Sequence, residues 1–119
     1  MYNFCHICSM KRIIAYKGLF QEFVEKLSIL EQQKIRRALA LLKQDEKIPS
    51  HYIKYIEQGV LELRISHCGN EFRIFFMYDG EDIIVLFNSF HKKTQKTPRK
   101  EIEKALKLKK EYYEAKRNQ

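Results

Sequence analysis

The chain has 119 residues, of which 45% are hydrophobic and 32% charged, a composition that excludes wholesale disorder and favours one globular domain. No apolar run approaches the roughly 20 residues of a membrane span, so no membrane association is expected. The formal net charge is +8, and residues 91–119 alone carry 11 Lys and Arg against 4 Asp and Glu. This terminal excess points to a polyanionic partner, nucleic acid first, with a solvated lysine-rich helix as the alternative.

Cysteine usage argues against a metal or a disulfide framework. Cys5 and Cys8 form one Cys-X-X-Cys half-motif, and a zinc set would need His67 and Cys68 to complete it. Because a structural zinc site usually shows two clean half-motifs, we expect free thiols in a reducing cytoplasm and no metal ion.

The N-terminal segment lacks a basic stretch followed by an apolar run, which argues against a secretory signal. The periodic pattern begins only at Lys11, so Met10 is an alternative start. We therefore expect residues 1–10 to be an extension, non-native or disordered, and residues 11–119 to form a single domain.

Hydrophobic periodicity predicts a short strand at 11–16 and a helix at 20–27, whose apolar residues recur at helical spacing. Ser28 and Glu31 have the spacing of a capping box, which ends this helix and begins a second one. The second helix is expected to run to about Lys43.

Beyond a loop at 45–52 the apolar period changes from 3.6 to 2, which predicts a three-stranded antiparallel meander over 60–90. Thr97 and Pro98 look like the N-cap and the first residue of a final helix. The resulting order, β-α-α-β-β-β-α, is an α+β domain whose helices pack on a largely antiparallel sheet.

The meander brings two arginines together. If the apolar residues of its first two strands share one face, Arg64 lies either directly opposite Arg73 or diagonal to it, on the face opposite the helices. Like charges so placed disfavour the sheet by up to about 1 kcal/mol. Two interpretations stay open: pairing with Glu62 and Glu71 on the same face, or an anion site in which the guanidinium groups bind phosphate.

A basic segment, residues 90–100, connects the meander to the final helix. Its cations approach a helix N-terminus, which prefers anions, so their placement is unfavourable unless a negative partner binds. On the arginine face, Phe75, Leu86 and Phe90 are expected to supply apolar groups, as a groove for a partner helix or for bases.

The element order, the segments 63–64 (LR) and 72–74 (FRI), and the run 90–98 (FHKKTQKTP) together resemble the phage-derived HigB-like branch of the RelE/ParE toxin superfamily. The resemblance implies a RelE-like fold and a cytoplasmic toxin of a type II toxin–antitoxin pair. Such toxins cleave messenger RNA, usually at the ribosome. The resemblance also implies a cognate antitoxin, typically with a helix-turn-helix domain.

Metal-independent RNA cleavage, which needs no cofactor, uses the 2′-hydroxyl of the substrate to attack the adjacent phosphate. By the resemblance Arg64 and Arg73 occupy functional positions, and we expect them to stabilise the phosphate. Lys93 is a candidate for neutralising developing charge or protonating the leaving oxygen, and His91 for general acid or base, although its position is expected to vary in the family. The expected RNA-binding residues are Lys92, Gln95, Lys96, Arg99 and Lys100.

Two other functions stay open. A ParE-like toxin inhibits DNA gyrase by binding, without chemistry, and a basic nucleic-acid-binding domain without activity relies on charge alone. A phosphate-stabilising cluster favours the nuclease, because inhibition by binding does not require one.

His51 and Tyr52, in the loop before the meander, are secondary candidates for contacting a base or a sugar.

Overall fold

A computed structural model describes residues 10–44 and 48–118, so Cys5, Cys8 and all of the expected extension except Met10 lie outside the described residues. Within the described part, five strands form one open sheet in the order β1-β5-β4-β3-β2, and only the β1–β5 pair is parallel. No helix in this part of the chain has the length and apolar character to cross a membrane. The elements are β1 (Arg12–Ala15), α2 (Leu19–Glu25), α3 (Ile29–Lys43), the 3-10 turn η2 (Ser50–Tyr52), β2 (Ile53–Glu57), β3 (Val60–His67), β4 (Asn70–Asp79), β5 (Ile83–Lys92) and α4 (Arg99–Arg117).

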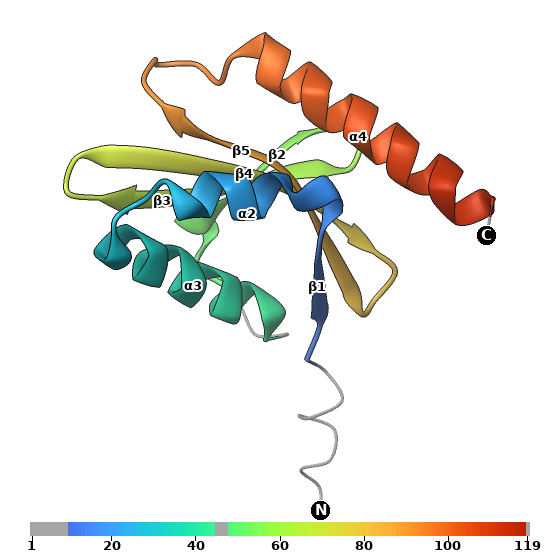
Figure 1. Cartoon of the computed structure of the whole chain (residues 1–119), viewed down its shortest axis with the longest axis horizontal. Helices are drawn as coiled ribbons and strands as arrows, with labels where there is room; N and C mark the ends of the chain where they lie inside the picture. Colours follow the sequence, from blue (N-terminus) through green and yellow to red (C-terminus); the bar gives the residue numbers. More distant parts are fainter. Residues whose placement is uncertain (1–9, 45–47, 119) are drawn as a thin grey trace, which may run out of the picture.

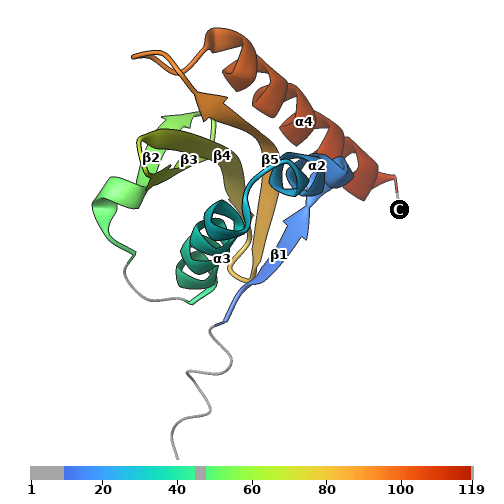
Figure 2. The same ribbon diagram turned by 60° about the vertical axis from the view of Figure 1, so that its left-hand side comes forward.

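Helices cover both sides of the sheet, as Figures 1 and 2 show: α2 and α3 lie on one face and α4 on the other. On the first, which we call face A, Leu63 and Ile74 are buried with Ile35 of α3. On the second, face B, Phe75 is buried with Ala105 of α4. The α+β class and the largely antiparallel sheet are therefore confirmed, but the expectation that one face is free of helices is wrong.

The helix α3 begins where the sequence predicts. The Oγ of Ser28 accepts a hydrogen bond from the Glu31 N–H at 3.2 Å, and the Glu31 carboxylate accepts one from the Ser28 N–H at 3.0 Å. This reciprocal capping box satisfies amide groups that have no partner within the helix. The buried stripe of Ile35, Ala38 and Leu42 faces the sheet at helical spacing, also as predicted.

The predicted element order lacks one strand. The structure contains β2 between η2 and β3, which makes the order β-α-α-β-β-β-β-α. Gln58 and Gly59 join it to β3 with φ angles of 51° and 83°, the pair of positive values typical of a type I′ hairpin turn. As an edge strand with Lys54 and Tyr55 exposed, β2 lacks the apolar alternation by which strands are recognised.

A bulge in β5 changes which face its side chains occupy. Ile74 pairs with Ser89 but Phe76 pairs with Leu86, so β5 accommodates one extra residue between the two pairs. Leu86 therefore belongs to the core on face A, whereas Phe90 packs against the core on face B. The prediction that Leu86 lies on the arginine face is wrong for this reason.

Near its C-terminal end, α4 is held to the sheet by a small polar network. The Tyr112 hydroxyl donates to Asp79 Oδ2 at 2.7 Å, and Lys116 Nζ donates to the same oxygen at 2.8 Å. Tyr112 is buried within the face B core, and Tyr113 packs against it. Both tyrosines therefore pack the last helix, as expected from the sequence.

Replacing Tyr112 with phenylalanine should change how stability depends on pH. Burial, followed by the hydrogen bond to Asp79, raises the pKa of Tyr112 from 10.0 to about 12. The neutral phenol is favoured in the folded state, so its contribution to stability is present below pH 10 and is lost as the pH rises to about 12. The free energy of unfolding of the native protein should therefore fall by roughly 2 kcal/mol between pH 10 and pH 12 through this residue. Tyr112→Phe should not show this part of the fall when both proteins are unfolded in urea. Identical pH dependence in the two proteins would contradict this role.

Candidate phosphate-binding site

The two arginines that the sequence places together are direct cross-strand partners, Arg64 on β3 and Arg73 on β4. This is the first of the two predicted registers, and it puts both side chains on face B. Arg73 is 3% exposed, whereas Arg64 is half-buried. Because like charges at such positions repel, their side chains require anions nearby.

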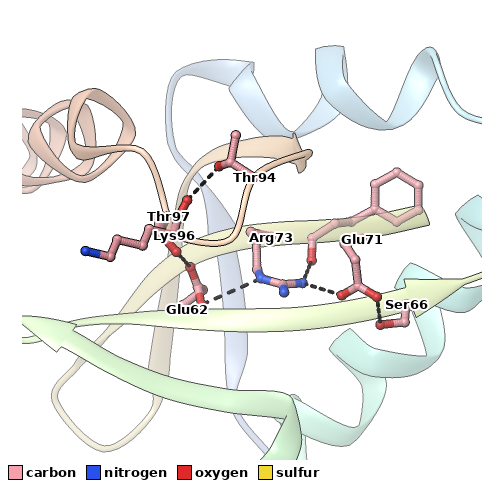
Figure 3. Close-up of polar contacts among 8 residues, drawn as sticks. Glu62, Ser66, Glu71, Arg73, Thr94, Lys96 and Thr97 are labelled. Carbon is pink, nitrogen blue, oxygen red and sulfur yellow. Dashed lines mark hydrogen bonds and ion pairs between the residues drawn. The ribbon is translucent and has the colours of Figure 1, made fainter. Parts of the chain in front are cut away.

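Two carboxylates compensate Arg73 (Figure 3). Its Nη1 donates to Glu71 Oε1 at 3.1 Å and to the carbonyl of Phe72 at 2.9 Å. Its Nε lies 3.7 Å from Glu62 Oε1 and has no hydrogen-bond partner within the described residues. Glu62 is only 1% exposed, so a buried charge pair underlies the site. The charge-pairing interpretation is therefore confirmed for Arg73, which also lines an open cavity.

Glu62 also holds the basic segment against the sheet. Its Oε2 accepts a hydrogen bond from the Thr97 hydroxyl at 2.8 Å (Figure 3). Thr97 is thus bonded to the sheet and does not cap α4, which begins at Arg99 with Pro98 as N-cap and without a side-chain cap. The prediction of Thr97 as N-cap and Pro98 as first helical residue is wrong, because the buried carboxylate takes the hydroxyl.

Two surface cavities lie beside the arginine pair. The first, which we call the lysine cavity, has a volume of about 360 Å³ and is lined by Glu71, Arg73, Lys92, Lys93, Thr94 and Gln95. The second, the aromatic cavity, has a volume of about 380 Å³ and is lined by Lys34, His51, Tyr52, Arg64, Ser66 and Glu71. Glu71 lines both, so the two cavities adjoin where the arginines face each other.

The lysine cavity has an excess of positive charge. Burial, followed by the positive charges of Arg73, Arg64 and Lys54, lowers the pKa of Lys92, and only Glu62 opposes this. A lowered lysine pKa means that the ammonium form is disfavoured where it stands. A bound anion would relieve that cost, which makes Lys92 a candidate for a functional site.

Glu71 stands between the two cavities as a fixed carboxylate. The Ser66 hydroxyl donates to its Oε2 at 2.7 Å, and this bond is the main cause that lowers the pKa of Glu71. The bond from Arg73 and the charges of Arg73 and Arg64 act in the same direction, while burial opposes them. Glu71 therefore remains ionised well into the acid range and pairs across the strands with Lys92.

The structure brings together part of the predicted site. Arg73, Lys92, Lys93 and Gln95 line one cavity, and Arg64 lines the adjoining one. These five residues come from three strands and the segment after β5, which explains why one run of sequence does not contain the site.

His91 does not join this cluster. It pairs with Phe72 across the strands, and the two ring centroids lie 5.2 Å apart, which places His91 on face A, away from the arginines. Strand alternation puts Lys92 on face B instead. Lys92, and not His91, therefore lies on the face that carries the arginine pair.

Three other predicted RNA contacts lie outside both cavities. The side chain of Lys96 points away from Arg73 in Figure 3, and Lys100 is exposed on α4. Arg99 donates to both Glu57 oxygens, at 2.6 and 3.2 Å, which raises its pKa. The acids beside the start of α4, which include Glu101 in its first turn, offset much of the positive charge that the sequence places there.

Sequence reasoning treated the glutamates only as counter-charges. Glu71 borders both cavities and Glu62 links Arg73 to the basic segment, and strand alternation was the signal that placed both beside the arginines. Lys34, from the polar side of α3, reaches the aromatic cavity without any signal in the sequence.

Among the described residues, no group of three or more His, Cys, Asp or Glu side chains is arranged to hold a metal ion. Cys68 is an exposed free thiol. The zinc hypothesis needed Cys5 and Cys8 as well, which lie outside the described residues.

Comparison with known families gives a match to a family of phage-derived proteins. Residues 22–110 match the family described as phage-derived protein Gp49-like (DUF891), a stretch that includes β2 to β5, both arginines and the basic segment. A search of curated proteins found no significant match. The matched stretch covers most of the chain, which therefore belongs to the Gp49-like family of phage-derived proteins, itself part of the RelE/HigB-like toxin family.

Proposed function

We propose that the protein is a HigB-like toxin of a type II toxin–antitoxin pair that cleaves messenger RNA without a metal ion. The observation that carries the proposal is the convergence of Arg64, Arg73, Lys92 and Lys93 on two adjoining cavities, which share Glu71 beside the arginine pair. A guanidinium fork matches two phosphate oxygens, and a cationic cluster stabilises the extra negative charge of a phosphorane. Membership of the Gp49-like family supports the toxin role.

The chemistry assigned to the site needs only its side chains and the RNA. The 2′-oxygen bonds to phosphorus while the bond from phosphorus to the 5′-oxygen breaks, which leaves a 2′,3′-cyclic phosphate and a 5′-hydroxyl. Glu71 accepts the 2′-hydroxyl proton, Lys92 gives a proton to the leaving oxygen, and solvent restores both groups. Arg64 and Arg73 stabilise the phosphorane, and Lys93 adds positive charge at the cavity rim.

The partners follow from this role. The protein acts in the cytoplasm on messenger RNA at the ribosome, and a cognate antitoxin with a helix-turn-helix domain holds it inactive. The positive charge of residues 91–119 supports both an RNA substrate and an acidic antitoxin segment.

Mapping RNA 5′ ends after a brief pulse of expression tests the proposal. We expect discrete new ends inside translated regions for the native chain, carrying 5′-hydroxyl groups that accept a ligated adaptor only after enzymatic phosphorylation. Arg64→Ala, which removes a half-buried guanidinium, should give at least about 10²-fold fewer ends.

Other outcomes of this experiment lead to the other functions. Growth arrest with intact messages would contradict the nuclease and favour gyrase inhibition. Abundant folded protein without arrest would indicate a basic nucleic-acid-binding domain. Lys104→Ala, an exposed change on α4, serves as the control that should cleave like the native chain.

A further inference from the structure

We propose that the aromatic cavity binds a nucleobase next to the phosphate held by the arginines, and so sets the base preference of the protein. This inference rests on the proposed function for its ligand, a single-stranded RNA, but it concerns a different part of the surface. The volume of about 380 Å³ falls in the range of roughly 300–1,000 Å³ typical of small-ligand sites.

The wall of this cavity is an aromatic pair. The rings of His51 and Tyr52 stack with centroids 4.5 Å apart and an interplanar angle of 33°. Tyr52 is half-buried and packs against the core on face A, whereas His51 is exposed. One ring is therefore fixed by the core and supports the other, which presents a face to an incoming base. Stacking on such platforms is how proteins hold bases of single-stranded RNA.

The opposite wall is a strand edge. The pairing of β2 with β3 ends at Leu63, whereas β3 continues to His67. Arg64 and Ser66, which belong to this continuation, line the cavity. The outer edge of β3 is thus not paired with β2 here, and the side chains of Arg64 and Ser66 from this stretch can meet the edge of a stacked base.

The charges around the cavity suit a nucleotide whose phosphate lies elsewhere. Its lining has two cations, Lys34 and Arg64, and one carboxylate, Glu71, and the other lining residues are the two rings and Ser66. The lysine cavity holds Arg73 and the lysines of the basic segment instead, so the two cavities differ in chemistry. Since they adjoin at the arginine pair, a base in one and its phosphate at the other belong to the same strand.

Short RNA probes test this arrangement. The purified full chain is titrated with fluorescent 2′-O-methyl RNA tetranucleotides, which cannot be cleaved by 2′-hydroxyl attack, and with versions that lack the base at one position at a time. We expect the loss of one particular base to weaken binding about tenfold or more, in the range measured for base–aromatic stacking. Loss of the bases elsewhere should have smaller effects.

Variants identify the cavity as the source of that difference. His51→Ala should bind the intact probe about as weakly as the native chain binds the probe that lacks that base. For the probe that lacks the base, His51→Ala and the native chain should have the same affinity. Tyr52→Phe keeps the ring and should behave like the native chain, and Lys104→Ala, an exposed change on α4, is the surface control. Thermal unfolding of each variant confirms that it is folded.

The outcomes separate this inference from the nuclease proposal. Equal binding of intact and base-lacking probes, or an equal loss for both in His51→Ala, overturns the base site even if the protein cleaves RNA. Base-dependent binding that disappears in His51→Ala supports the site even if no cleavage is found, in which case only the nuclease proposal fails.

Discussion

Arg73→Ala is expected to abolish measurable RNA cleavage and to lower the free energy of unfolding by about 3–5 kcal/mol. The guanidinium is assigned to the phosphorane, and removal of one such stabilising group typically costs about 10²–10³ in rate. The stability loss has another cause: Glu62, 1% exposed, would remain as a buried carboxylate without its cation. Because the chain has no tryptophan, unfolding in urea is best followed by far-ultraviolet circular dichroism.

A double variant separates these two effects. Glu62→Gln combined with Arg73→Ala removes the stranded charge, so it should recover a large part of the lost stability without recovering cleavage. The amide introduced at position 62 also retains an oxygen that accepts the Thr97 hydroxyl bond. A double variant as unstable as Arg73→Ala alone would contradict the buried-pair argument, and one that cleaves RNA would contradict the assignment of Arg73.

Lys92→Met is expected to lower the cleavage rate by about 10²-fold or more without lowering stability. General acids contribute factors of this size, and no other group in the lysine cavity is assigned the proton for the leaving oxygen. Stability should be preserved or should rise, because burial and neighbouring cations already disfavour the charged lysine in the folded state. Rates and urea denaturation of Lys92→Met are compared with those of Lys104→Met, whose side chain is exposed on α4.

The pH profile provides a sharper test of the same residue. The rate should fall as the pH rises through the lowered pKa of Lys92, so its half-maximal point should lie below the ordinary lysine value of 10.5. Arg64→Ala should move that point upward while lowering the rate, because the charge of Arg64 contributes to the lowering. A midpoint that stays in place in this variant would contradict the assignment of Lys92 as the acid.

Local sequence signals were sufficient wherever one side chain dominates the local geometry. The Ser28 capping box, the stripe of α3 and the placement of Arg64 beside Arg73 on one face follow from spacing and alternation, and the structure has all three, with the direct one of the two possible registers. These features depend on residues close in sequence or on one hairpin, where few arrangements satisfy the pattern.

The errors arise where a distant residue decides. The bulge in β5 shifts Leu86 to face A, and nothing in the run of apolar residues reveals where an extra residue is inserted. Thr97 has the composition of a cap, yet the carboxylate of Glu62, distant in sequence, takes its hydroxyl. The same long-range packing makes β2 an edge strand and brings Lys34 to the aromatic cavity, so the make-up of this cavity required the fold.

The two oxygens of Glu62 have a thermodynamic consequence. One oxygen faces Arg73 and the other accepts the hydrogen bond of Thr97. A phosphate that binds the guanidinium of Arg73 competes with Glu62 for it, and so changes the strength of both contacts of Glu62. Anion binding and the ordering of the basic segment are then linked equilibria, and each must change the free energy of the other by the same amount. The same carboxylate thereby couples the occupancy of the site to the segment that carries Lys93 and Gln95 into the cavity.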